Sequence, residues 1–205
     1  MFDRALSSAL QRPLKRMAAG LIALGLRADQ ITWAGFVMGL SAIPLIALGQ
    51  PAWAILSMAL NRLADGLDGA IARQTRPTDL GAFLDISLDF LFYAAIPLAF
   101  VLADPARNGL AGALLIYSFI GTGCTFFAFA VLAAKRGATS SAAYPSKGFY
   151  YLGGLTESTE TMAVFVLMCL LPQWFGVLAC TFASLCALTT AMRIGAGIAV
   201  FKSET

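Results

Sequence analysis

The sequence contains no histidine and few charged residues. Charged side chains make up 12% of its 205 residues and hydrophobic ones 59%, whereas a soluble domain carries about 25% charged residues. The missing histidine excludes His-based catalysis and His-rich metal sites. The net charge of +3 is too small to indicate a nucleic-acid partner. The composition therefore predicts an integral membrane protein.

The cysteines form no recognisable motif either. Cys124, Cys169, Cys180 and Cys186 show no Cys-x-x-Cys spacing and lie in apolar runs. We interpret them as small buried hydrophobic residues. No cleavable signal peptide is expected, because Arg and Lys are scattered through residues 1–27 without a compact apolar core.

Four aspartates stand out against this apolar background. Asp65 and Asp68 are three residues apart, and Asp85 and Asp89 are four apart. Residues at these spacings share one face of a helix, so two facing helices would gather four carboxylates. The carboxylates would repel one another without cations between them, and oxygen ligands favour Mg²⁺ or Mn²⁺. Neutralisation by Arg62 and perhaps Arg193 is the alternative, but two arginines cannot neutralise four carboxylates.

Hydropathy and length predict an all-α membrane protein of two parts. Residues 1–28 would form a juxtamembrane segment, whose basic amphipathic helix over 4–24 lies in the membrane interface, packs on the protein, or does both. Residues 29–205 would form a domain of six transmembrane helices. The first span is expected over 31–49, capped by Asp29 and bent at Pro44. The second span is expected to begin at residue 52 and the third to end at residue 103. The fourth is expected over 110–134, the fifth to end at residue 171, and the sixth over 174–201.

Helix length predicts that the two aspartate pairs lie at one depth. Fourteen residues precede Asp65 in the second span and fourteen follow Asp89 in the third, about 21 Å each way. Six spans would put both termini on one side, together with eleven basic residues, against Arg107 alone on the other. By the positive-inside rule, both termini and the aspartate-bearing helix ends face the cytosol.

The segment from Asp65 to Asp89 resembles the signature of the CDP-alcohol phosphotransferases (CDP-alcohol phosphatidyltransferases). That signature reads Asp-x-x-Asp-Gly-x-x-Ala-Arg and then Gly-x-x-x-Asp-x-x-x-Asp. Every fixed position is met: Asp65, Asp68, Gly69, Ala72, Arg73, Gly81, Asp85 and Asp89. The resemblance implies a membrane transferase of phospholipid biosynthesis that uses Mg²⁺ or Mn²⁺, with two ions expected, and that can form a homodimer. It also implies that Asp65, Asp68 and Asp85 hold the metal, while Asp89 is the base or a fourth ligand.

Further site residues follow from the same resemblance and from position. The CDP-binding candidates are Asp65, Gly69, Ala72, Arg73, Gly81 and, more weakly, Thr32. Close helix packing would also explain the small residues, and Arg73 could instead reach lipid headgroups. The acceptor-pocket candidates are Lys147, Glu157, Glu160 and Arg193. As alternatives, Thr156 would cap a helix whose dipole both glutamates complement, and Arg193 is interpreted as a residue at headgroup level rather than an anion clamp.

The motif indicates the reaction more sharply than the acceptor. Ile86 and Phe90 follow the third and fourth aspartates, where phosphatidylglycerophosphate and cardiolipin synthases usually have Pro and Lys, so glycerol 3-phosphate is a less expected acceptor. The whole chain resembles a proteobacterial inner-membrane branch of the family. The expected reaction transfers a phosphatidyl group from CDP-diacylglycerol to a small polar alcohol. The alternatives are a soluble CDP-alcohol donor with a lipid acceptor, a cation transporter, or a member that binds without catalysis.

Overall fold

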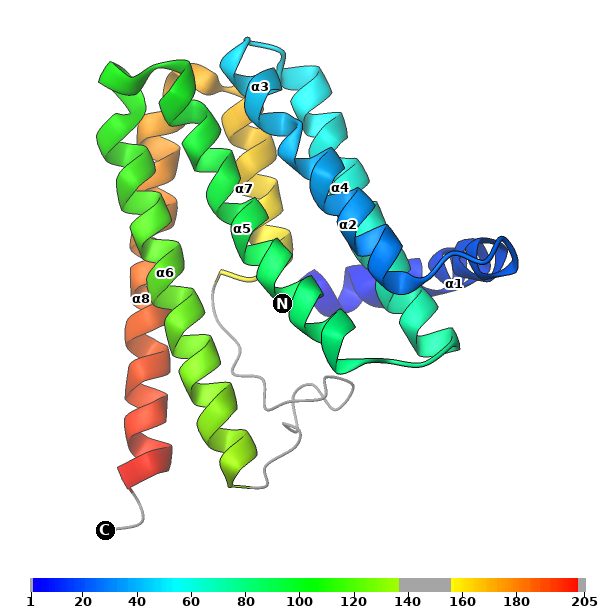
Figure 1. Ribbon diagram of the computed structural model, residues 1–205. Helices are drawn as coiled ribbons and strands as arrows, with labels where there is room; N and C mark the ends of the chain where they lie inside the picture. Colours follow the sequence, from blue (N-terminus) through cyan, green and yellow to red (C-terminus); the bar gives the residue numbers. More distant parts are fainter. Residues whose placement is uncertain (1, 137–155, 203–205) are drawn as a thin grey trace.

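Helices form all the regular structure in residues 2–136 and 156–202, the part of the chain that the computed structural model describes (Figure 1). This confirms the all-α prediction for that part. The elements in chain order are α1 (Phe2–Ala23), α2 (Ala28–Leu40), α3 (Ala42–Ala47), α4 (Pro51–Gln74), α5 (Asp79–Ala103), α6 (Pro105–Lys135), α7 (Ser158–Leu170), the short 3₁₀ helix η1 (Pro172–Trp174) and α8 (Phe175–Lys202).

The long helices pack in pairs. Helix α2 lies along α4, and α6 lies along α8, with α5 in contact with both α2 and α6 (Figure 1). The turns that join α3 to α4, α5 to α6 and α7 to α8 lie at one end of the bundle. Helix α1 lies across the other end, where α4 ends and α5 begins. The aspartate motif spans the α4–α5 connection and therefore lies toward the same end as α1.

The predicted bend at Pro44 is confirmed. Helix α2 ends at Leu40 and α3 begins at Ala42, because the ring of Pro44 would clash with the carbonyl four residues earlier. The expectation that Asp29 caps this span is wrong. Arg27 occupies the N-cap position, its backbone N–H donates to the Gln30 side chain at 2.9 Å, and Asp29 lies in the first turn. A carboxylate there still complements the helix dipole.

Four helical segments of the described chain are long and apolar enough to cross a membrane. They are Ala28–Ala47, Asp79–Ala103, Pro105–Lys135 and Pro172–Lys202. The chain is therefore a multi-pass α-helical membrane protein. Helix α4 has 24 residues but carries Arg62, Asp65 and Asp68, which lower its hydropathy. Helix α7 has 13 described residues, about 20 Å, so six spans stay a prediction.

The largest cluster of buried apolar side chains contains residues from each of the α-helices α3 through α8. Within it, the rings of Phe100 and Phe175 stack with centroids 4.5 Å apart. A second, smaller cluster packs α1 on α4 through Ala18, Ala70 and Ile71. Helix α1 thus packs on the protein, which confirms one of the two interpretations of the N-terminal helix. The division of the chain into two parts at residue 28 stays a prediction.

The interpretation of all four cysteines as buried residues was half right. Cys169 and Cys186 are buried in the first cluster, whereas Cys124 and Cys180 are exposed on α6 and α8. Apolar helix faces that point away from the bundle are exposed to lipid in a membrane protein, so an apolar sequence environment does not by itself predict burial against protein.

Candidate active site

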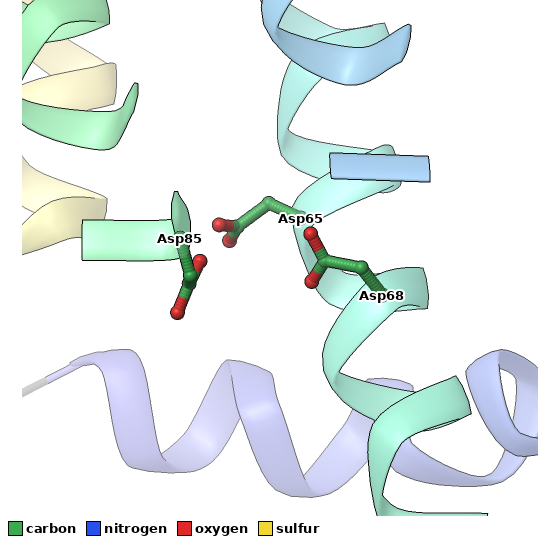
Figure 2. A group of neighbouring side chains, drawn as sticks. All are labelled: Asp65, Asp68 and Asp85. Atoms are coloured by element: carbon green, nitrogen blue, oxygen red, sulfur yellow. The ribbon is translucent and has the colours of Figure 1, made fainter. Parts of the chain in front are cut away.

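Three of the four motif aspartates form one group. Asp65 and Asp68 project from α4 toward Asp85 on α5, and one carboxylate oxygen from each lies within 4.8 Å of the others (Figure 2). The three-residue spacing puts the first two on one face of α4, and the packing of α5 brings the third against them. This confirms, for three of the four aspartates, the prediction that the two helices gather their carboxylates.

The donor set of this group fits a divalent cation. Asp68 is buried, and its Oδ2 atom has no hydrogen-bond partner. A buried carboxylate oxygen without a partner is costly, so such an atom indicates a position where a cation can bind. Three carboxylates with only oxygen atoms to offer suit Mg²⁺ or Mn²⁺ rather than a softer metal. Asp65, Asp68 and Asp85 are therefore the residues that could hold the predicted ions.

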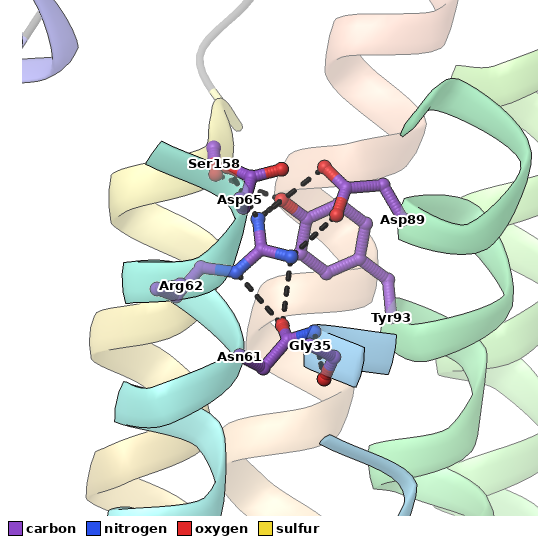
Figure 3. A network of polar contacts seen from close by, with 7 residues as sticks. All are labelled: Gly35, Asn61, Arg62, Asp65, Asp89, Tyr93 and Ser158. Atoms are coloured by element: carbon purple, nitrogen blue, oxygen red, sulfur yellow. Dashed lines mark hydrogen bonds and ion pairs between the residues drawn. The ribbon is translucent and has the colours of Figure 1, made fainter. Parts of the chain in front are cut away.

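Asp89, the fourth motif aspartate, lies outside this group. Its carboxylate makes a two-pronged ion pair with Arg62 on α4: Nη2 donates to Oδ1, and Nη1 donates to Oδ2 at 3.3 Å (Figure 3). The same guanidinium lies 3.6 Å from Asp65 Oδ2. Arg62 thus pairs with two of the four aspartates, as the alternative of neutralisation by arginine proposed, and leaves Asp68 and Asp85 without an arginine among the described ion pairs. The placement of Asp89 as a metal ligand finds no support in this geometry.

The predicted nucleotide-binding residues fall into two sets. Thr32 lines a small cavity between α2, α4 and α5 together with all four motif aspartates. Gly69, Ala72, Arg73 and Gly81 do not line it and lie closer to the α4–α5 connection. A Cβ at Gly69 would lie 3.1 Å from Arg73 Nη1, so the guanidinium covers this glycine. The structure therefore brings Thr32, but not these four residues, to the cavity that the carboxylates line.

A second and larger cavity begins at Asp89 and extends between α5, α6, α7 and α8. Its volume is about 190 Å³, and its walls carry aromatic rings and hydroxyl groups. Two of the predicted acceptor-pocket residues, Glu157 and Arg193, line it. Glu160 does not, and Lys147 lies outside the described residues. Asp89 lines both cavities and thus lies at the boundary between them.

Two interpretations at this second cavity were wrong. Arg193 does not reach toward headgroups: it is buried, donates to the Thr122 carbonyl at 3.0 Å and lies 5.7 Å from the Phe126 ring centre. Thr156 does not cap α7, because Glu157 holds the N-cap position and Thr156 donates to the Thr189 hydroxyl at 3.3 Å. Both errors come from contacts that are remote in sequence. Arg193 contacts α6, and Thr156 contacts α8.

Sequence reasoning treated Arg62 only as a counter-ion and missed its partners. Asn61 accepts from Arg62, and the Tyr93 hydroxyl joins Arg62 to Ser158 at the start of α7 (Figure 3). A partial signal was available. Arg62 lies three residues before Asp65, and Tyr93 lies four after Asp89, so each shares a helix face with a motif residue.

Comparison with known proteins identifies relatives along almost the whole chain. The sequence model of the CDP-alcohol phosphatidyltransferase family matches residues 26–193. The inner membrane protein YnjF of Escherichia coli (strain K12) is 49% identical over 203 residues, which is 99% of this chain and 98% of that protein. An archaetidylinositol phosphate synthase of Pyrococcus horikoshii is 32% identical over 112 residues, 54% of this chain and 60% of that protein.

Solved structures show the same fold. The phosphatidylinositol phosphate synthase of Mycobacterium tuberculosis with CDP-DAG bound superposes with a TM-score of 0.69 at 21% identity, over 91% of this chain and 94% of that one. The same synthase in complex with manganese and citrate gives a TM-score of 0.67 at 21% identity, over 90% and 88%. At this identity the likeness concerns the fold alone.

Proposed function

The chain belongs to the CDP-alcohol phosphatidyltransferase family of membrane transferases, and we propose that it transfers a phosphatidyl group from CDP-diacylglycerol to a small polar alcohol, releasing CMP. The observation that carries the proposal is the position of Asp89. This carboxylate separates the cavity that holds the three-carboxylate group from the larger, polar-lined cavity. A donor whose diphosphate lies beside the three-carboxylate group and an acceptor in the larger cavity would meet at Asp89.

Asp65, Asp68 and Asp85 would hold one or two Mg²⁺ or Mn²⁺ ions beside the donor's diphosphate. Ions bound there would withdraw charge from the diphosphate and make CMP a better leaving group. The mycobacterial synthase, which has this fold, binds manganese in one structure and CDP-DAG in another, which supports both ligands here. Thr32, Gly69, Ala72, Arg73 and Gly81 would bind the nucleotide near the carboxylates.

Asp89 would act as the general base. It takes the proton of the acceptor's hydroxyl while that oxygen forms a bond to the phosphorus that carries the lipid. The bond between this phosphorus and the CMP oxygen breaks, and CMP leaves with the electron pair. Glu157 and Arg193 would bind the polar groups of the acceptor from the walls of the second cavity.

The active site would open to the cytosol of a bacterium, across its inner membrane. The ends of α4, α6 and α8 that lie on the α1 side carry Arg73, Lys135 and Lys202. Arg107 lies at the opposite end, where it donates to the Gln173 carbonyl. This charge asymmetry supports six spans with cytosolic termini. The relative YnjF is named an inner membrane protein, which supports the location.

The test is CMP release by the full chain purified in detergent. Mn²⁺, CDP-diacylglycerol and pooled acceptors (glycerol 3-phosphate, serine, inositol, inositol phosphate, choline and phosphatidylglycerol) are supplied, and the pool is divided once release is seen. Asp89→Asn should lose acceptor-dependent release. Asp79→Asn is the matched control, because Asp79 is an exposed carboxylate on the same helix and should keep wild-type rates.

Two further arms separate the alternatives. Exchange of the partners, with a soluble CDP-alcohol as donor and a lipid as acceptor, tests the second reaction with the same chemistry. Metal flux in proteoliposomes tests a cation transporter. The gathering of the acidic residues in one group, rather than along a path across the membrane, argues against this alternative. No CMP release with either donor would contradict the proposed function.

A further inference from the structure

The guanidinium of Arg62 is fixed by hydrogen bonds on all sides, although it has no role yet in the proposed reaction. A guanidinium has five N–H groups in a fixed planar fork. In Arg62 all are used: Nε and Nη2 donate to Asn61 Oδ1 at 3.0 and 2.8 Å, Nη2 and Nη1 each donate to one Asp89 oxygen, and Nη1 donates to the Tyr93 hydroxyl at 3.1 Å. The fork is therefore locked in one orientation.

The residues that hold Arg62, directly or through one partner, come from α2, α4, α5 and α7. Asn61 Nδ2 donates to the Gly35 carbonyl on α2 at 3.0 Å, so the arginine's partner is itself fixed. The Tyr93 hydroxyl lies 2.7 Å from the Ser158 hydroxyl, where α7 begins (Figure 3). The rings of Phe92 and Tyr93 lie 5.2 and 5.4 Å from the guanidinium carbon, within cation–π range.

This arrangement decides which way the Asp89 carboxylate faces. A two-pronged arginine–carboxylate pair fixes the plane of the carboxylate as well as its place. Asp89 shares a helix face with Asp85, so without Arg62 it could rotate toward the other three carboxylates. Paired with Arg62, it stays outside their group and at the inner end of the second cavity.

We propose that Arg62 is the positioning residue of the transfer reaction: it holds Asp89 away from the metal-binding carboxylates and presents it to the acceptor's hydroxyl. The inference rests on the proposed function, since it assigns Asp89 as the base. It adds a residue outside the eight fixed positions of the motif. Arg62 itself need not touch either substrate, because it acts through Asp89.

The inference makes an unusual prediction for metal binding. Arg62→Gln removes a positive charge 3.6 Å from an Asp65 oxygen and frees Asp89 to join the group. Mn²⁺ should therefore bind about tenfold more tightly, since cation–cation repulsion is lost, while the rate of transfer falls about a hundredfold. A residue that only stabilised the fold would lower both. The readout is the free Mn²⁺ signal in electron paramagnetic resonance, together with kcat and the acceptor KM.

Two other variants make the test specific. Arg62→Lys keeps the charge but cannot form the fork, so Mn²⁺ affinity should stay at the wild-type value while kcat falls about tenfold. Arg107→Gln removes an exposed arginine at the opposite end of the bundle and should change neither quantity. All variants are compared with the wild type as full chains in the same detergent, with thermal unfolding measured for each.

Either of two results would overturn the inference. One is an Arg62→Gln variant that unfolds like the wild type but binds Mn²⁺ no more tightly. The other, which holds even where that variant fails to fold, is an Arg62→Lys variant with wild-type kcat. The failure of the proposed function is distinguishable, because it would show as a wild type that releases no CMP while the Mn²⁺ affinities still follow the predicted order.

Discussion

The side-chain amide of Asn61 donates a hydrogen bond of 3.0 Å to the backbone carbonyl of Gly35. This bond joins α4 to α2 one residue before Arg62, at a point where both residues are buried. Gly35 also lies directly against Ala64, the residue before Asp65. The position of the aspartate-bearing face of α4 therefore depends on how closely α2 approaches it.

The first prediction concerns this close approach. In Gly35→Ala the added Cβ would overlap the Ala64 Cβ, so α2 must move away from α4. We expect a loss of about 1–3 kcal/mol in unfolding free energy, typical of overpacking, and lower transfer activity. Thermal unfolding in detergent measures the first. Gly109→Ala is the control, since nothing lies within 4 Å of a Cβ there, and equal stability of the two variants would contradict the packing argument.

The second prediction concerns the metal. Asp68→Asn removes one charge from the three-carboxylate group and should weaken Mn²⁺ binding by at least about tenfold. Equilibrium titration with Mn²⁺ of the purified chain measures this without any assay of activity. Asp79→Asn, an exposed carboxylate of α5, should bind Mn²⁺ as the wild type does. If both variants retain wild-type affinity, the group at Asp65, Asp68 and Asp85 is not the metal site.

The third prediction separates the two cavities. Glu157→Gln and Arg193→Gln change charges that line only the larger cavity. We expect the acceptor KM to rise about tenfold, the cost of one charge-assisted hydrogen bond, while the KM for CDP-diacylglycerol stays unchanged. Ser184→Ala on the exposed side of α8 serves as the control. A rise in the donor KM instead would place the donor, rather than the acceptor, in this cavity.

The fourth prediction tests Gly69 as part of the nucleotide site. A Cβ at Gly69 would meet only the end of the flexible Arg73 side chain, so Gly69→Ala should change stability by less than about 0.5 kcal/mol. If a nucleotide occupies the space beside Gly69, the same methyl group should weaken CDP binding, measured by calorimetry in the presence of Mn²⁺. Undiminished CDP affinity would show that the nucleotide does not occupy the space beside Gly69.

Much of the candidate site could be predicted from local spacing. Asp65 and Asp68 share a helix face at any tertiary arrangement, and so do Asp85 and Asp89, because the helix repeat fixes it. The length of apolar chain on either side of the motif is equally local, and it predicts that the two pairs lie at one depth. The bend at Pro44 was predictable for the same reason, since proline affects the carbonyl four residues before it.

Two of the predictions that failed depended on partners remote in sequence. Arg193 and Thr156 were assigned from their positions along one helix each, but contacts with Thr122 on α6 and Thr189 on α8 determine where they lie. The exposed Cys124 and Cys180 were misassigned because, in a membrane protein, apolar residues on both faces of a helix look alike in sequence.

Local sequence was enough to predict an all-helical membrane chain with carboxylates at helical spacing and the full motif of one transferase family. How those carboxylates divide, three into one group and Asp89 into an ion pair with Arg62, depends on the packing of α4 against α5. The two residues are 27 positions apart on different helices. Periodicity fixes the face of a helix on which a side chain lies, whereas packing between helices fixes what that side chain meets.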